Sequence, residues 1–353
     1  MVRHPGFIIL FGSGETSPSG RRAWDWLFQR LYEPIRVAIL ETPAGFQPNS
    51  ARVAERVADF VRHHLQNYHP QVTVIPARKR GTPFSPDDPR ILEPLLQANV
   101  IFLGPGSPTY AVRQLRGSLA WHMLLARHRL GAAIVLASAA SIAVSTHALP
   151  VYEIYKVGEE LHWQEGLDFF SPYGLRLTFI PHWDNAEGGE ELDTSRCFMG
   201  QARFSRLMEM LPSDVRMIGI DEHTALAVDF AAETCEVLGR HGVVLIHGGG
   251  TRRFTRGQTF ALAELGPFRM PRPGEGLPPE VWRTVAASAE ATQERKPPPE
   301  IQDLVRKREE ARARKDWCTA DALRDQILAL GWRVLDTPRG PRLEPIAGDL
   351  TNN

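Results

Sequence analysis

Short apolar segments that recur between amphipathic stretches constrain the fold of this chain more than any other feature. The segments expected to be strands are Phe7–Phe11, Arg36–Leu40, Val72–Pro76, Val100–Leu103, Ala133–Leu136, Arg176–Ile180, Val215–Ile220 and Val243–Ile246. The early ones are apolar throughout rather than alternating, which is typical of parallel strands covered on both faces. A sheet with helices on both sides is therefore the expected framework.

The stretches between these segments have helical patterns, at Arg21–Tyr32, Asn49–His69, Asp88–Ala98 and Thr109–Arg129. Regular alternation of strand and helix predicts an α/β fold, with a three-layer, doubly wound, mostly parallel sheet. Ligand sites in such folds lie at the carboxyl ends of the strands. Functional residues are therefore expected in the loops that follow Leu10, Leu40, Leu103 and Leu136.

Composition narrows the functional classes. The 353 residues include 41 basic and 41 acidic side chains, so no overall attraction to nucleic acid or an anionic membrane is expected. The three cysteines are far apart and predict neither a disulfide framework nor a zinc site. No segment approaches the roughly 18 apolar residues of a membrane span. We expect a cytoplasmic protein without metal or cofactor. The sequence leaves open whether the protein forms a homo-oligomer.

The character of the chain changes near residue 270. We expect an α/β domain over 1–270, a Pro-rich linker over 271–300, a small helical module over 301–346 and a tail over 347–353. In the module, Ala320, Leu323, Ile327 and Leu330 recur at helical spacing and Gly331 ends the helix. A helix pair followed by a short hairpin is predicted there.

Ser138 lies where a predicted strand ends and a helix begins. Its hydroxyl can face outward from the turn, and the backbone N–H of Ala139 can stabilise an oxyanion. From these residues alone a simple helix N-cap is the favoured interpretation. The preceding loop, from Gly104 through Gly106 to Ser107, offers the Gly106 N–H as a second oxyanion donor.

His182 directly follows another predicted strand, where a general base could reach Ser138. Glu153 is the leading candidate for the carboxylate that orients the histidine, with Asp184 and Glu187 as alternatives. The cluster Asp221–His223 is interpreted as a structural or pocket-lining turn, because adjacent strand residues point to opposite faces and rarely share a metal ion.

Five sequence motifs together resemble one known family: FGSGE, FLGPGSPTYAVRQL, LASAAS, IPHWDN leading to RFSRLMEML, and GIDEHTAL. They are similar to the serine peptidase family of dipeptidase E and cyanophycinase, in the class I glutamine amidotransferase-like superfamily. The resemblance covers residues 6–260 and implies a flavodoxin-like fold and a serine-type hydrolase of small or aspartate-containing peptides.

The resemblance implies that Ser138 is the nucleophile, His182 the base and Glu153 the acid. Gly106 and Ala139 would provide the oxyanion donors, and the pocket residues would be Gly104, Ser107, Asp184, Asn185 and Glu15. The chain departs from the family's Gly-x-Ser-Ala-Gly elbow because Leu136 and Ala140 replace the two glycines. A Cβ at each place crowds the turn, which leaves a non-catalytic pocket protein as the alternative.

Residues 301–345 are similar to the C-terminal module of cysteinyl-tRNA synthetases, through the run KDW, AD, LRD and DTP. The resemblance implies tRNA as a partner, with Arg308, Arg312 and Lys315 as candidate RNA contacts. No HIGH-type or KMSKS-type motif is present, so synthetase activity is not expected. Basic and acidic residues are interleaved in this segment, which favours a solvated helix with ion pairs over a phosphate-binding surface.

Overall fold

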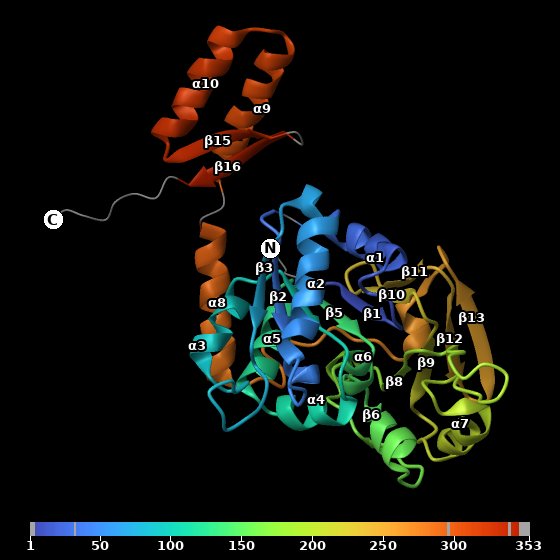
Figure 1. The fold of residues 1–353 in the computed structure, drawn as a ribbon. Helices are drawn as coiled ribbons and strands as arrows, with labels where there is room; N and C mark the ends of the chain where they lie inside the picture. The colour runs from blue at the N-terminus through green and yellow to red at the C-terminus, as the bar shows by residue number, and fades with distance from the viewer. Residues whose placement is uncertain (1–3, 32, 295–296, 338–339, 346–353) are drawn as a thin grey trace. The chain divides into compact units, whose positions relative to one another are not determined.

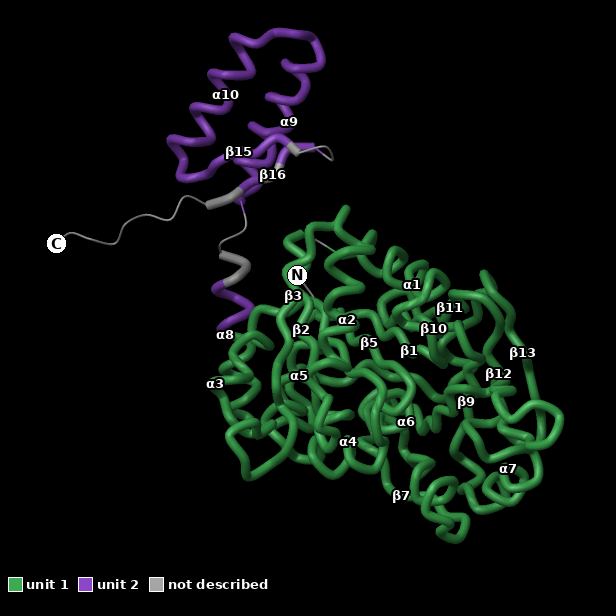
Figure 2. Tube along the Cα trace, viewed as in Figure 1, with its two compact units in different colours: residues 1–286 green, residues 287–353 purple. Residues whose placement is uncertain are grey.

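The computed structural model describes residues 4–31, 33–294, 297–337 and 340–345. The chain divides into two compact units, residues 1–286 and 287–353, which are coloured separately in Figure 2. The domain boundaries expected from the sequence stay predictions, and the expected tail at 347–353 lies outside the described residues.

An eight-stranded sheet forms the centre of the first unit, in the order β14-β11-β10-β1-β5-β4-β2-β3 (Figure 1). Its parallel part consists of β1 (Ile8–Phe11), β2 (Arg36–Leu40), β3 (Gln71–Ile75), β4 (Val100–Leu103) and β5 (Ala133–Ala137). Beside β1, the sheet continues with antiparallel β10 (Thr224–Asp229), β11 (Thr234–Gly239) and β14 (Thr259–Ala261).

Both faces of this sheet are buried. Ile9 and Phe11 pack in one core with Trp24 of α1 (Pro18–Phe28) and with α2 (Ser50–His64). Ile8 and Leu10, which point the other way, pack in a second core with α5 (Leu119–Arg129) and with the region of α3 (Pro89–Leu92) and α4 (Pro108–Leu115). The apolar strand pattern therefore arises from helices on both sides, and the predicted α/β class is confirmed.

A second, smaller sheet contains β8 (Leu177–Ile180), β9 (Arg216–Ile220), β12 (Gly242–His247) and β13 (Gly250–Thr255), in the order β13-β12-β9-β8. Phe179 and Ile218 belong to the same core as Ile8 and Leu10, so this sheet shares the core of the main sheet. The sequence predicted β8, β9 and β12 as strands but not as a separate sheet. The unit also contains α6 (Ala139–Ala143), α7 (Gly200–Glu209) and the short strands β6 (His147–Ala148) and β7 (Gln164–Glu165).

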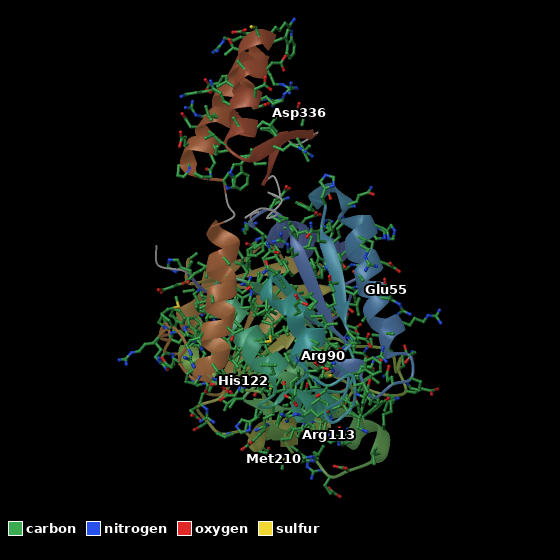
Figure 3. All side chains as sticks on the ribbon, turned by 90° about the vertical axis from the view of Figure 1, so that its left-hand side faces the viewer. Glu55, Arg90, Arg113, His122, Met210 and Asp336 are labelled. Carbon is green, nitrogen blue, oxygen red and sulfur yellow. The ribbon has the colours of Figure 1, made fainter. Side chains whose placement is uncertain are left out.

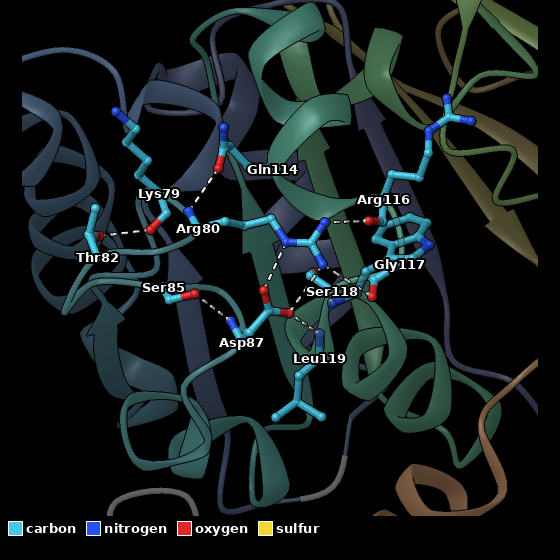
Figure 4. A network of polar contacts seen from close by, with 11 residues as sticks. Lys79, Arg80, Thr82, Ser85, Asp87, Gln114, Arg116, Gly117, Ser118 and Leu119 are labelled. Atoms are coloured by element: carbon cyan, nitrogen blue, oxygen red, sulfur yellow. Dashed lines mark hydrogen bonds and ion pairs between the residues drawn. The ribbon is translucent and has the colours of Figure 1, made fainter.

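A polar network fixes the long loop after β3 against helices α4 and α5 (Figure 4). The Arg80 guanidinium donates to Asp87 at 2.8 Å, and the Arg80 backbone N–H donates to the Gln114 side chain at 2.8 Å. Asp87 also accepts from the Leu119 N–H, at the start of α5, at 3.0 Å. The loop thus supports α4, the helix that begins directly after Gly106 and Ser107.

The second unit is a helix pair followed by a hairpin: α9 (Pro299–Ala313), α10 (Trp317–Ala329), β15 (Trp332–Thr337) and β16 (Gly340–Pro345). Its core contains Ile301, Ile327, Trp332 and Val334. Helix α8 (Pro279–Glu294) occupies much of the expected linker, and its Val281 and Val285 pack in the core of the first unit. No helix in the described ranges is long and apolar enough to cross a bilayer.

Arg308 lies inside the second unit and not on its surface. Its side chain is 5% exposed, and its two terminal nitrogens lie 2.8 and 2.9 Å from the carboxylate of Asp336, which is labelled in Figure 3. Arg312 also pairs with Asp336. The expectation that Arg308 is an RNA contact is therefore wrong, because the guanidinium is buried and committed to Asp336. Lys315, the third candidate, is exposed.

Candidate active site

Ser138 occupies a strained turn between β5 and α6. Its backbone has φ +52° and ψ −111°, a conformation that L residues rarely adopt, and its hydroxyl makes no capping bond to α6. Ser138 thus occupies the N-cap position of α6, but the interpretation that its side chain serves as a cap is wrong. The hydroxyl is free to point away from the helix, which is the property that a nucleophile at such a turn requires.

The turn forms although its two usual glycines are absent. Leu136 and Ala140 are 0% and 1% exposed, and both pack in the core that also contains Leu10. Their Cβ atoms thus point into apolar packing and do not block the turn. The replacement of these glycines is accommodated by the fold.

The His182 ring faces Ser138. Strand β8 ends at Ile180, and His182 itself has a positive φ of +50°, with its backbone N–H donating to the Gly12 carbonyl at 3.2 Å. The Nε2 atom lies 2.9 Å from the Ser138 hydroxyl oxygen. The sequence prediction placed these two residues together, and the distance is that of a hydrogen bond.

The carboxylate that contacts His182 belongs to Glu222, which lies in the turn between β9 and β10. Its Oε1 atom is 2.8 Å from His182 Nδ1. Glu153 lies in a π-helical segment, Glu153–Val157, and its Oε2 atom is buried without a hydrogen-bond partner among the described residues. The expectation that Glu153 orients His182 is corrected. The interpretation of the Asp221–His223 cluster as merely structural or pocket-lining also missed this contact.

The two polar residues after His182 support Glu222. Asn185 donates from Nδ2 to Glu222 Oε1 at 3.1 Å, and Asp184 Oδ1 accepts the Glu222 backbone N–H at 2.7 Å. The hydrogen bond to His182, followed by that to Asn185, holds the pKa of Glu222 below its usual value against the opposing effect of burial. Glu222 is therefore ionised near neutral pH and can hold the histidine in one orientation.

The loop before α4 brings Gly106 into the lining of the pocket that contains Ser138. A Cβ at Gly106 would lie 2.0 Å from the Pro43 carbonyl oxygen, so only glycine fits this close approach. Gly106 and Ala139 both line the pocket around Ser138. Ser107 caps α4 by accepting from the Tyr110 N–H, and Gly104 lines a different, small cavity beside α2. Those two residues shape the loop and do not line the pocket.

Glu15, in the loop after β1, is half-buried near this site. Burial raises its pKa, and the hydrogen bond from its own backbone N–H, followed by the guanidinium of Arg56, opposes that effect. The residue does not line the pocket around Ser138. The expectation that Glu15 lines the pocket is therefore not met in the structure.

The pocket at Ser138 has a volume of about 320 Å³. Glu187, one of the alternative acids, lines it together with Cys197. Burial raises the pKa of the Cys197 thiol to about 12, so this sulfur is protonated and is a poor nucleophile near neutral pH. Ser138 is the nucleophile candidate that has a base beside it.

Known structures show which fold the first unit has. A solved peptidase from an acI-B1 Actinobacterium superposes with a TM-score of 0.59 and 22% identity, covering 74% of this chain and 98% of that one. This likeness shows a common fold, a large mostly parallel α/β sheet with helices. The fold expected from the resemblance to serine peptidases is thereby confirmed.

The second unit has close relatives in sequence. Residues 295–340 match the family model of the cysteinyl-tRNA ligase anticodon binding domain. The cysteine–tRNA ligase of Lactobacillus helveticus is 54% identical over 43 residues, which are 12% of this chain and 9% of that protein. That of Methanosarcina mazei is 51% identical over 47 residues, or 13% and 10%. The chain thus matches about a tenth of the length of these curated relatives.

Proposed function

We propose that the first unit is a serine-type hydrolase that cleaves a peptide or amide bond. The observation that carries the proposal is the 2.9 Å contact between the Ser138 hydroxyl and His182 Nε2, made from a strained turn that leaves the hydroxyl uncapped. The contact of Glu222 with the opposite ring nitrogen supports it, because a nucleophile, a base and an orienting carboxylate form one chain of hydrogen bonds. The fold of a peptidase agrees with this reaction class.

The reaction begins when Ser138 Oγ attacks the carbonyl carbon and its proton passes to His182 Nε2. Glu222 holds the ring by accepting from Nδ1 and stabilises the imidazolium that forms. The tetrahedral intermediate collapses as His182 donates the proton to the leaving amine, and the carbon–nitrogen bond breaks. Water then attacks the acyl-enzyme, gives a proton to His182 and releases the acid, after which the proton returns to Ser138.

The N–H groups of Gly106 and Ala139 are the donors we assign to the oxyanion. Both residues line the same pocket as Ser138. Among the described residues, neither N–H donates a hydrogen bond to a backbone carbonyl in a turn, loop or cap. One such donor contributes about 10²–10³-fold to kcat in serine hydrolases.

A fluorophosphonate probe tests the nucleophile directly. We expect wild-type protein to be labelled, Ser138→Ala to lose the label, and peptide mapping to place the label on residue 138. The matched control is Ser205→Ala, which removes an exposed hydroxyl on α7. That hydroxyl donates to the Gln201 carbonyl and makes no hydrogen bond to a histidine of the described chain. Equal labelling of wild type and Ser138→Ala would overturn the proposal.

We infer a second function for the second unit, which is contact with tRNA. The match to an anticodon binding domain supports it, and the basic residues Arg314 and Lys315 are exposed between α9 and α10. Arg308 and Arg312 are excluded as the main contacts because both bind Asp336.

Fluorescence anisotropy with a labelled tRNA transcript tests this second function on the full chain. We expect tRNA binding to weaken as the salt concentration rises. The double variant Arg314→Glu/Lys315→Glu should reduce the affinity about tenfold, because lost phosphate contacts remove binding free energy, and should also lower the salt dependence. The matched control, Arg21→Glu/Arg22→Glu, reverses two charges on α1 of the first unit and should leave binding unchanged. An equal effect of both double variants would contradict a site in the second unit.

A further inference from the structure

The walls of the pocket beside Ser138 are mainly apolar. Ile142 and Val151 are buried in a hydrophobic cluster, and Tyr155 and Phe198 pack against that cluster from the pocket side. The rings of Tyr155 and Phe198 lie 5.4 Å apart, so they form one continuous aromatic surface. A pocket of this kind gains most from a ligand that brings apolar surface of its own.

The backbone that carries Phe198 has an unusual conformation. Arg196, Cys197 and Phe198 are three consecutive residues with positive φ, at +57°, +58° and +67°. Such residues persist only where the surroundings hold them, and strain of this kind clusters at functional sites. Here the Arg196 guanidinium lies 4.0 Å from the Trp183 ring and donates to the Trp183 carbonyl at 2.9 Å.

This segment is also tied to the base. The Cys197 N–H donates to the His182 carbonyl at 3.1 Å, and the Phe198 ring lies 5.8 Å from the His182 ring. A ligand side chain that packs on Phe198 therefore lies next to the base that serves Ser138. The aromatic wall is positioned to select the residue beside the bond that is cleaved.

Charged groups in the pocket do not favour an acidic side chain. Among the described residues that line it, Lys156 is the cation and Glu187 the anion, and both are exposed. The Lys156 ammonium lies 5.0 Å from the Tyr155 ring. A carboxylate placed against Ile142 and Val151 would lose its hydration without gaining a buried arginine, which is the partner that such groups require.

We propose that this pocket takes the aromatic or branched aliphatic side chain of a short peptide. The proposal rests on the hydrolase function above, and it names the substrate class of that site. It differs from the acidic peptides that the family resemblance implies, because the side chains that meet the ligand here are aromatic and aliphatic.

Binding of dipeptides to the full chain carrying Ser138→Ala tests the proposal without requiring turnover. Titrations followed by NMR would use Phe-Ala, Leu-Ala and Asp-Ala. We expect Phe-Ala and Leu-Ala to bind at least roughly tenfold more tightly than Asp-Ala. Equal or tighter binding of Asp-Ala, or no saturable binding of Phe-Ala up to about 10 mM, would overturn the proposal.

Two further variants in the Ser138→Ala background locate the effect. Phe198→Ala should weaken Phe-Ala binding roughly fivefold or more, and Phe198→Leu, which keeps apolar bulk and guards against misfolding, should restore most of it. Val157→Ala is the matched control, because it truncates a side chain that is 72% exposed on the segment carrying Tyr155. An equal loss with Val157→Ala would contradict the role of Phe198.

The outcomes separate this proposal from the hydrolase function. Labelling of Ser138 by the fluorophosphonate together with a preference for Asp-Ala would overturn the pocket assignment alone. A preference for Phe-Ala without labelling would support the pocket and overturn the hydrolase.

Discussion

His182 Nδ1 lies 2.8 Å from Glu222 Oε1, across a separation of 40 residues in the chain. The contact exists because β8 and β9 are adjacent parallel strands of the smaller sheet, so the residues that follow them meet at the same edge. Ser138 comes to the same place from the end of β5 in the main sheet. The candidate active site therefore lies where the carboxyl ends of two different sheets converge.

The identity of the acid can be tested by two isosteric substitutions. We expect Glu222→Gln to lower kcat by about 10²–10⁴-fold, because the ring of His182 loses the group that fixes its tautomer and stabilises its charge. Glu153→Gln should stay within about twofold of wild type, since Glu153 makes no contact with the ring. Kinetics with a cleavable Phe-containing peptide measure both, and the reverse order of effects would restore Glu153 as the acid.

Asn185 predicts a change in pH dependence. Its hydrogen bond lowers the pKa of Glu222, so Asn185→Ala should raise that pKa towards its ordinary value. The carboxylate would then be protonated at a higher pH during acidification, and ¹³C NMR of the labelled Glu222 side chain would measure that shift. An unchanged Glu222 pKa in Asn185→Ala would contradict the role of this hydrogen bond.

Gly106 predicts a loss of catalysis with retained folding. In Gly106→Ala the new Cβ would lie 2.0 Å from the Pro43 oxygen, so the loop must shift. This shift reorients the backbone N–H of residue 106, which we assign to the oxyanion. We expect kcat to fall by about 10²–10³-fold. Gly117→Ala is the control: its φ is +66° with no atom within 4 Å of the new Cβ, so it should cost about 1 kcal/mol of stability and leave kcat unchanged. Circular dichroism and kinetics on both variants separate the two effects.

Asp336 predicts acid sensitivity of the second unit. The Arg308 guanidinium, with Arg312, lowers the pKa of Asp336 from 3.8 to about 2. Because the pKa is depressed in the folded state, the ionised carboxylate stabilises the unit fully above about pH 4, and this contribution is lost as the pH falls towards 2. We expect a contribution of about 1 kcal/mol, discounted because the Asp336 side chain is half exposed.

Urea unfolding between pH 6 and pH 2.5 checks this prediction, with ¹⁹F NMR of 5-fluorotryptophan at the buried Trp332 as the local probe. Trp332→Phe assigns that signal among the eight tryptophans. In Asp336→Asn, the dependence on pH in this window should be smaller by the contribution of the ion pair. An identical pH dependence in wild type and variant would contradict the assignment.

The sequence predicted the parallel strands well because their apolar runs are continuous. Arg36–Leu40 and Val100–Leu103 have the same bounds in the structure as in the prediction. The second sheet could not be predicted, since the apolar pattern of β8 and β9 shows burial but not which strands pair with them. Thr109–Arg129 was expected as one helix and is divided between α4 and α5, with Gly117 between them at φ +66°.

Within the site, Ser138 and His182 could be found because each follows a predicted strand directly. Glu222 follows β9 in the same way, with Asp221 between them, so the rule that located the histidine would also have located the acid. Glu153 was preferred because it lies a short interval after Ser138 in the sequence. Proximity in the chain was the weaker guide, since the residues that meet are brought together by strand pairing.

The left-handed backbone of Ser138, His182 and the segment Arg196–Phe198 has a consequence for how the protein fails. Each of these residues costs about 1–3 kcal/mol, and they are held by packing and hydrogen bonds from the surrounding elements. Mild heat or denaturant relaxes such places before it melts the sheets. Inactivation should therefore precede unfolding, and a sample can keep its secondary structure after the geometry around Ser138 has been lost.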